Sequence, residues 1–349
     1  MTFPFSNNGN GNGNNSDAHD ASEYQVISSE ELDRMARQMQ NELIASDPAA
    51  ADYFQTKQIR TINVGELFSM EFKPREYILE PIIQTQGTTM LYSKRGVGKT
   101  YLALGIACAV AAGTRFLRWV APKPNKVLYV DGEMPGVTMR ERLAGIIGAM
   151  NMPPDAANLN IITPDLQVQA IPNLSGSIGQ QMVEDEIRDS KLLVLDNLST
   201  LCRAGKENES DSWIPVQEWV LSLRRKGISV LMVHHAGKNG AQRGTSSRED
   251  VLDTVIALRH PSDYGPEQGA RFEIHYEKAR NTAGIQLEPF EVQISSKPGI
   301  IDWQIHDIRE VHVSRARELF QIGCSVRDVS QELGISIGAT HKLKHKLGL

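Results

Sequence analysis

Cysteine is scarce in this sequence: three residues among 349, at Cys108, Cys202 and Cys324. They form no CxxC pair and no metal-ligand spacing, which argues against a disulfide framework and indicates a reducing compartment. No run of about 18 apolar residues occurs, so no membrane-spanning helix is predicted. The N-terminal residues also lack the basic region and apolar stretch of a secretory signal. We therefore expect a cytoplasmic protein with no membrane partner.

The sequence has no excess of positive charge either. Its net charge is −5, which argues against a protein that coats nucleic acid. The charge is unevenly distributed, however. Residues 1–80 carry 13 acidic and 6 basic side chains, whereas residues 312–349 carry 6 basic and 3 acidic side chains together with three histidines. The basic surface is therefore expected at the C-terminal end.

The N-terminal region shows little capacity to form a core. Residues 1–22 are rich in Asn, Gly, Ser and Asp and are predicted to be a disordered tail. Residues 23–60 form a predicted helical arm with a helix at Ser29–Ala45, capped by Ser28 or Ser29. Its apolar residues fall on one face at helical spacing: Leu32, Met35, Ala36, Met39 and Leu43. This face packs on its own domain or docks on a neighbouring subunit.

Short apolar runs alternate with helical stretches from Thr88 onward. The runs have the length of buried strands: Thr88–Tyr92, Lys126–Val130, Leu159–Thr163, Lys191–Leu195 and Ser229–Val233. The helical stretches are residues 100–112, 136–150, 178–189 and 213–226. This alternation predicts an α/β fold with a parallel sheet flanked by helices, within residues 61–308. A later pair of runs predicts a β-rich extension: Val255–Arg259 and Arg271–Lys278.

A glycine-containing loop separates the first strand from its helix. The segment SKRGVGKT matches the phosphate-binding pattern GxxxxGK[ST] except at Ser93, where the first glycine belongs. The sequence leaves open whether this serine weakens or stiffens the turn. Lys99 is expected to reach the β and γ phosphates of a nucleotide, and the Thr100 hydroxyl to bind Mg²⁺. Glycines let successive backbone N–H groups face the phosphates. The predicted nucleotide site comprises Lys94, Arg95, Gly96, Val97, Gly98, Lys99 and Thr100.

Acidic residues follow two other predicted strands. Asp196 ends the strand LLVLD and is predicted to hold Mg²⁺ through water. The strand KVLYV is followed by Asp131, Gly132 and Glu133. Cleavage by water needs a base near the nucleophile, and a carboxylate at this edge of the sheet is well placed for that role. We favour Glu133 over Asp131 as the base; the alternative is that both acids only cap the next helix.

Two histidines end a further predicted strand at the same edge, His234 and His235. A polar side chain there can contact the γ-phosphate and respond to its loss, and we favour His235 for this role. The alternative is a pair of ordinary loop histidines. Zinc binding is disfavoured because no third ligand has a suitable spacing in the sequence.

Taken in order, several segments define one pattern over roughly residues 60–295: SKRGVGKT, VLYVDGE, LLVLDNLSTL with the acidic KENESD, VLMVHHAGK, RGTSSREDVLDTV and YEKARN. This order resembles the RecA-like ATPases of the plasmid RepA-type hexameric helicases, relatives of the DnaB-type replicative helicases. The resemblance implies a RecA-like fold that uses ATP and Mg²⁺, with Glu133 as the base and His235 as the sensor.

The resemblance also implies a function for the segment Lys278–Asn281. It resembles a Lys-x-Arg element that such rings insert into the ATP site of the neighbouring subunit. An arginine supplied in trans stabilises charge on the γ-phosphoryl group and can raise the rate about 10³–10⁵-fold. Lys278 and Arg280 would then be catalytic, and the active unit would be a homo-oligomer, in particular a hexamer. The alternative is a solvated strand edge.

The polar loop at residues 236–249 carries Lys238 and Arg243 among Gly, Ser and Thr. The equivalent loop of a RecA-like ring lines the central channel. By this resemblance, Lys238 and Arg243 are expected to bind phosphates of single-stranded DNA without reading its sequence. The alternative is a disordered surface loop.

Residues 309–349 are predicted to form a small all-α domain. Three short helices are expected, at His312–Ile322, Ser325–Leu333 and Ile337–Leu347. A turn at Gly334 precedes the basic last helix, as in a helix-turn-helix DNA-binding domain. The residues expected to face duplex DNA are Thr340, His341, Lys342 and Lys344. The alternative is a helical clip for subunits or partner proteins. This tail departs from the RepA-type pattern.

Three hypotheses of function follow. The first is an ATP-dependent DNA helicase that moves as a ring on single-stranded DNA during replication. The second is a DNA-binding RecA-like ATPase that acts as a recombination or repair mediator, or as a regulatory switch, without unwinding. The third is an ATPase of the same fold that does not act on DNA. The channel loop favours the first, and the tail favours the first two over the third.

Overall fold

The computed structural model describes residues 28–46, 60–203, 213–237, 251–280, 282, 284–297 and 300–349. The chain divides into two compact units, Met1–Lys73 and Pro74–Leu349. Three predictions fall outside the described residues: the disordered tail at residues 1–22 and the DNA-binding roles of Lys238 and Arg243.

The first unit contains helices α1 (Ser29–Ser46) and α3 (Val64–Ser69). The Ser28 hydroxyl accepts a hydrogen bond from the backbone N–H of Glu31 at 3.2 Å, which is the predicted N-cap. Two methionines of the predicted apolar face of α1, Met35 and Met39, are more than half exposed. The surface on which α1 packs stays a prediction.

The second unit is built on a nine-stranded sheet with the order β13-β12-β11-β10-β3-β9-β8-β6-β7. The strands from β10 to β7 in this order are all parallel to one another. They are β3 (Thr88–Ser93), β6 (Val127–Asp131), β7 (Leu159–Ile162), β8 (Leu192–Asp196), β9 (Ser229–His235) and β10 (Thr254–Arg259). The predicted α/β class is confirmed, with its parallel strands close to the predicted bounds.

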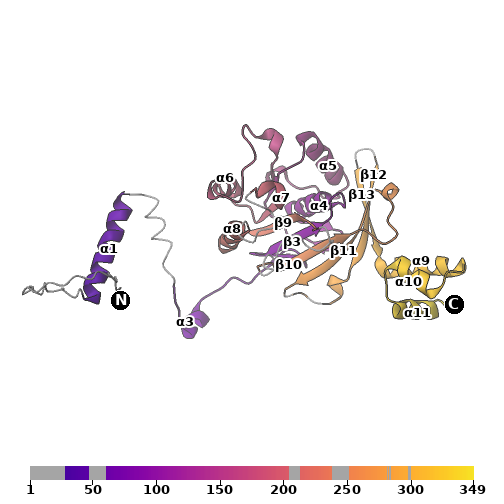
Figure 1. The fold of residues 1–349 in the computed structure, drawn as a ribbon. Coiled ribbons are helices and arrows are strands. Elements are labelled where there is room, and N and C mark those ends of the chain that lie inside the picture. Colours follow the sequence, from indigo (N-terminus) through magenta and orange to yellow (C-terminus); the bar gives the residue numbers. More distant parts are fainter. Residues whose placement is uncertain are drawn as a thin grey trace, which may run out of the picture. The chain divides into compact units, whose positions relative to one another are not determined.

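Helices cover both faces of the sheet (Figure 1). One apolar layer is formed with α4 (Lys99–Ala112) and α5 (Gly136–Gly148). The other is formed with α6 (Ser177–Ile187), α7 (Leu198–Leu201) and α8 (Ile214–Arg225). Strands β3, β6 and β8 are buried along their whole length, because both of their faces are covered. This explains why these strands appear in the sequence as continuous apolar runs.

The sheet is mixed, and its antiparallel part lies where the sequence predicts a β-rich extension. Beyond β10, three strands follow in antiparallel order: β11 (Ala270–Ala279), β12 (Phe290–Lys297) and β13 (Ile300–Asp307). The sequence predicted only the first of them. Short connections between these strands require antiparallel neighbours, whereas parallel strands need a longer crossover. Two small hairpins complete the unit: β1 (Tyr77–Leu79) with β2 (Ile83–Gln84), and β4 (Arg115–Phe116) with β5 (Trp119–Val120).

The C-terminal residues form the three expected short helices, α9 (Ile308–Gln321), α10 (Val326–Leu333) and α11 (Ile337–Lys346). They share a small core of their own, made by Ala316, Leu319, Val329 and Leu333. Ser325 and Asp328 form the predicted capping box, and Gly334 ends α10 in the left-handed conformation. Among the helices of the described residues, none has the length and apolar composition of a membrane span.

Candidate functional site

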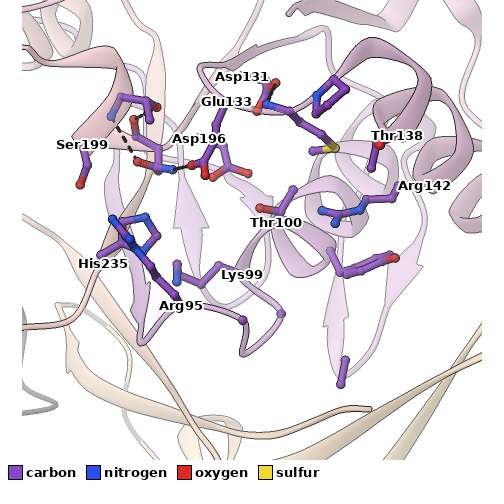
Figure 2. Close-up of a pocket in the computed structure, with 18 residues that line it drawn as sticks. Arg95, Lys99, Thr100, Asp131, Glu133, Thr138, Arg142, Asp196, Ser199 and His235 are labelled. Carbon is purple, nitrogen blue, oxygen red and sulfur yellow. Dashed lines mark hydrogen bonds between the residues drawn. The ribbon is translucent and has the colours of Figure 1, made fainter. Parts of the chain in front are cut away.

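The carboxyl ends of β3, β6, β8 and β9 meet at one edge of the sheet, because these strands are parallel neighbours. A pocket of about 540 Å³ opens there. Figure 2 shows the labelled side chains around this space. The residues that line it are Arg95, Gly96, Gly98, Lys99, Thr100, Tyr101, Asp131, Glu133, Met134, Pro135, Thr138, Arg142, Asp196, Asn197, Ser199, Thr200, His235 and Ala270.

The predicted phosphate loop leads from β3 directly into α4. Gly96 and Gly98 have positive φ values of 80° and 127°, which favour glycine. Ser93 is the last residue of β3 and has no positive φ, so a glycine is not required there. Its hydroxyl donates to the carbonyl of Lys94 at 2.8 Å and accepts from Lys99 at 3.1 Å. These two hydrogen bonds connect Ser93 to Lys94 and Lys99 at the start of the loop. They favour the view that the serine stiffens the turn rather than weakens it.

Gly98 also lies against a strand of the extension. A Cβ atom at this position would approach Cε1 of Phe272, on β11, to 2.7 Å. We therefore expect Gly98→Ala to lower the free energy of unfolding by about 2–4 kcal/mol, through backbone strain and overpacking together. Urea unfolding followed by circular dichroism measures this change.

Gly227→Ala is the matched control, since Gly227 also has a positive φ of 85° but no atom within 4 Å of its Cβ position. Its cost of about 1 kcal/mol reports the backbone alone. Equal losses for the two variants would show that contact with Phe272 has no energetic cost.

Lys99 is the buried cation of the pocket, with 6% of its surface exposed. Its Nζ donates to the carbonyl of Ser93 at 3.1 Å, to the Ser93 hydroxyl at 3.1 Å and to the carbonyl of Lys94 at 2.8 Å. Burial lowers the pKa of Lys99 to about 8, against the opposing influence of the negative charges of Asp196 and Glu133. The ammonium group is thus held at the phosphate loop.

Thr100 and Asp196 lie together, as expected of groups that share a metal ion. A side-chain hydrogen bond joins them, and Tyr129 Oη donates to Oδ2 of Asp196 at 2.7 Å. Burial raises the pKa of Asp196 above its ordinary value. The sequence did not single out Tyr129, which packs beneath the site on β6.

The two acids after β6 differ in their surroundings. The Asp131 carboxylate is buried and accepts hydrogen bonds from the Met134 N–H at 2.9 Å and from the Thr163 hydroxyl at 3.4 Å. Burial raises the pKa of Asp131 to about 6. Glu133 is exposed to the pocket, and its Oε2 accepts from Nδ2 of Asn197 at 2.8 Å. Asp131 thus holds the turn that follows β6, and Glu133 faces the open space.

The two histidines that end β9 also separate. His234 is buried within the sheet, with 1% of its surface exposed, whereas His235 lines the pocket. In Figure 2 the ring of His235 lies on the same side of the pocket as Arg95. The geometry thus brings His235, rather than His234, to the site.

Some predicted nucleotide-binding residues do not line the pocket. The Val97 side chain packs in the apolar core, and Lys94 contributes its carbonyl to Lys99. Other lining residues were missed by the sequence interpretation. The Arg142 guanidinium lies over the Tyr101 ring, 4.6 Å from its centroid. The two stacked groups form a flat wall of the pocket, next to Thr138. Arg142 comes from α5, so only the tertiary structure brings it to α4.

Lys278 and Arg280 do not contribute to the lining of this pocket. Lys278 belongs to β11, opposite Val255 of β10, and Arg280 directly follows the end of β11. Lys278 therefore lies within the strand and Arg280 just beyond it, and their role in trans stays a prediction. Arg280 is exposed, and its backbone N–H donates to the carbonyl of Asp253 at 2.8 Å.

The C-terminal helices correct one predicted contact. Thr340 has no exposed surface, and its hydroxyl donates to the carbonyl of Ser336 at 3.1 Å. Thr340 packs between the helices, so the prediction that it faces DNA is wrong. His341 and Lys342 are exposed, while Lys344 is half-buried with its Nζ 5.0 Å from the centroid of the Phe320 ring.

The residues of the pocket fit ATP with Mg²⁺. Glycines with positive φ and the N-terminus of α4 favour phosphate oxygens, and Lys99 adds a cation. Thr100 and Asp196 offer the hydroxyl and carboxylate oxygens that Mg²⁺ prefers. The volume of about 540 Å³ lies within the range of sites for small molecules and cofactors.

Comparison with known proteins adds four findings. The chain is 25% identical over 231 residues to the DNA repair proteins RadA of Salmonella typhimurium and of Escherichia coli strain K12. Each match covers 64% of this chain but only 44% of the relative. A KaiC-like protein of Pyrococcus horikoshii matches 65% of this chain and 93% of its own at 16% identity, with a TM-score of 0.47. Residues 54–241, more than half of the chain, match the AAA_25 family, described as AAA domain. The chain therefore belongs to the AAA_25 family of AAA domains.

Proposed function

We propose that this protein hydrolyses ATP with Mg²⁺ and couples hydrolysis to movement on DNA, as a ring helicase of DNA replication. The observation that carries the enzymatic part is the convergence of Lys99, Thr100, Asp196 and Glu133 on one pocket. Membership of the AAA domain family supports it.

In this proposal, each of these residues has one task. Lys99 exchanges the oxygens of its own loop for those of the β and γ phosphates. Thr100 and Asp196 would hold Mg²⁺, which would supply positive charge to stabilise the phosphate oxygens. Glu133 takes a proton from the attacking water, whose oxygen bonds to the γ-phosphorus as the bond to the β–γ bridging oxygen breaks. His235 contacts the γ-phosphate, and the flat wall of Arg142 and Tyr101 suits the nucleobase.

An oligomer is part of the proposal because the two expected cations lie away from the pocket of their own chain. Lys278 lies in β11 and Arg280 directly follows that strand, and neither of them lines this pocket. An arginine in trans would complete the site. The number of subunits we propose is six.

DNA is the proposed polymer partner. Lys238 and Arg243 would hold single-stranded DNA in the channel of the ring. Exposed basic side chains of the C-terminal helices support binding of duplex DNA by His341, Lys342 and Arg327. The half-buried Lys344 would contribute less, because its ammonium group lies over Phe320.

A second candidate is a mediator of recombination or repair that does not unwind DNA. The similarity to the DNA repair proteins RadA favours it. The two candidates share the same ATP site and differ in whether hydrolysis separates strands.

Strand displacement on a forked DNA duplex, with Mg²⁺ and ATP, separates the two candidates. The matched control is Glu133→Gln, which keeps the size and hydrogen-bonding capacity of the side chain but removes the base. We expect the normal protein to unwind the fork. For Glu133→Gln we expect ATP turnover to fall by about 10²–10⁴-fold.

DNA-stimulated hydrolysis without strand separation would replace the helicase by the mediator. A normal protein that hydrolyses no ATP, alone or with DNA, would contradict both candidates. Turnover by Glu133→Gln equal to that of the normal protein would remove Glu133 from the role of base.

A further inference from the structure

Asn197 directly follows Asp196 and begins the short helix α7. Its Nδ2 donates to Oε2 of Glu133 at 2.8 Å, and its Oδ1 accepts from the backbone N–H of Thr200 at 3.3 Å (Figure 2). We propose that Asn197 is a positioning residue that holds the Glu133 carboxylate in the orientation from which it takes a proton from water. This inference rests on the proposed ATP hydrolysis.

The orientation of the Asn197 amide follows from its two partners. The Thr200 N–H is a donor, so it faces the amide oxygen, and the Glu133 carboxylate is an acceptor, so it faces the amide nitrogen. The opposite orientation would place donor against donor and acceptor against acceptor. Asn197 is 5% exposed, which leaves water little access to replace either partner.

The backbone around Glu133 is held by a separate contact. The Gly132 N–H donates to the carbonyl of Asp196 at 2.8 Å, which joins the ends of β6 and β8. A Cβ atom at Gly132 would lie 2.4 Å from the Thr200 hydroxyl, so α7 packs directly on this segment. The backbone contact does not orient the Glu133 side chain, which is exposed and has three rotatable bonds. The hydrogen bond from Asn197 selects one of its orientations.

Asn197 has two roles that different substitutions separate. Serine and aspartate serve as N-caps about as well as asparagine, so either preserves the start of α7. Neither can donate an amide hydrogen to Glu133, and aspartate places a second carboxylate against it. A role limited to capping predicts no change for Asn197→Ser, whereas the positioning role predicts slower hydrolysis for this variant.

The test uses full-length protein with saturating Mg²⁺ and compares ATP turnover with the affinity for a fluorescent ATP analogue. For Asn197→Ser we expect kcat to fall roughly 10- to 100-fold, while the dissociation constant of the analogue changes by no more than about 2-fold. Asn197→Asp is expected to lower kcat at least as far. Retained analogue binding shows that the variants are folded.

A double substitution decides whether Asn197 acts through Glu133. In the background of Glu133→Gln, which lacks the base, Asn197→Ser is expected to cause no further loss of the residual turnover. A normal kcat for Asn197→Ser, a parallel loss of analogue binding, or an additive loss in the double variant would overturn the inference. If the normal protein hydrolyses no ATP, the proposed function itself is overturned; if it does and Asn197→Ser matches it, only the role of Asn197 is.

Discussion

Replacing Lys99 by alanine is expected to lower ATP turnover by about 10³-fold or more, to background. Lys99 is the buried cation of the pocket, and no other lysine lines it among the described residues. Without it, the negative charge of the phosphates would face Asp196 and Glu133 with less compensation. A coupled assay for released phosphate measures the change.

Lys123→Ala is the control for this substitution. Lys123 is exposed and pairs with Glu76 outside the pocket, so its loss removes a lysine without changing the site. Turnover that survives in Lys99→Ala would show that the loop from Ser93 to Thr100 is not the phosphate-binding element.

Replacing Arg280 by alanine is expected to lower hydrolysis by about 10³–10⁵-fold while leaving nucleotide affinity nearly intact. The reason is that Arg280 is proposed to act on the site of a neighbouring subunit, in the transition state rather than in nucleotide binding. Paired measurements of turnover and of fluorescent analogue binding separate the two effects. Equal loss of both would argue against a role in trans.

Mixing the two inactive variants provides a sharper test. A subunit with Arg280→Ala retains Lys99, and a subunit with Lys99→Ala retains Arg280. Where an Arg280→Ala subunit receives Arg280 from a neighbouring Lys99→Ala subunit, one complete ATP site is restored. The mixture is therefore expected to recover ATP turnover that neither variant has alone. A mixture as inactive as its components would contradict the proposed exchange between subunits. Arg188→Ala, at an exposed arginine paired with Glu186, is the matched control.

The parallel part of the sheet was predictable because its strands are buried on both faces and end in chemically distinctive residues. Asp131, Asp196 and His235 each end such a strand, so their meeting at one edge followed from the α/β pattern. Strands β12 and β13 were missed. In β12, apolar Phe290, Val292 and Ile294 alternate with polar residues, and this weaker signal was not interpreted as a strand.

The candidate site was predictable where its residues are neighbours in the chain. The segment from Ser93 to Thr100 needs only one strand, one turn and one helix. By contrast, the hydrogen bond between Asn197 and Glu133 joins residues 64 positions apart in the sequence. Phe272, which lies against Gly98, comes from the distant strand β11. The burial of Thr340 likewise depends on how α11 packs in the core formed with α9 and α10. Such contacts depend on packing, which spacing alone does not encode.

The hydrogen bonds of Lys99 also have a consequence for the release of product from the proposed ATP site. The ammonium group has three oxygen partners, all supplied by Ser93 and Lys94. If Lys99 binds the phosphates as proposed, the same oxygens would accept its hydrogen bonds again when the product leaves, so no unpaired buried charge would remain. In the proposed reaction, these loop oxygens would therefore lower the free-energy cost of releasing ADP.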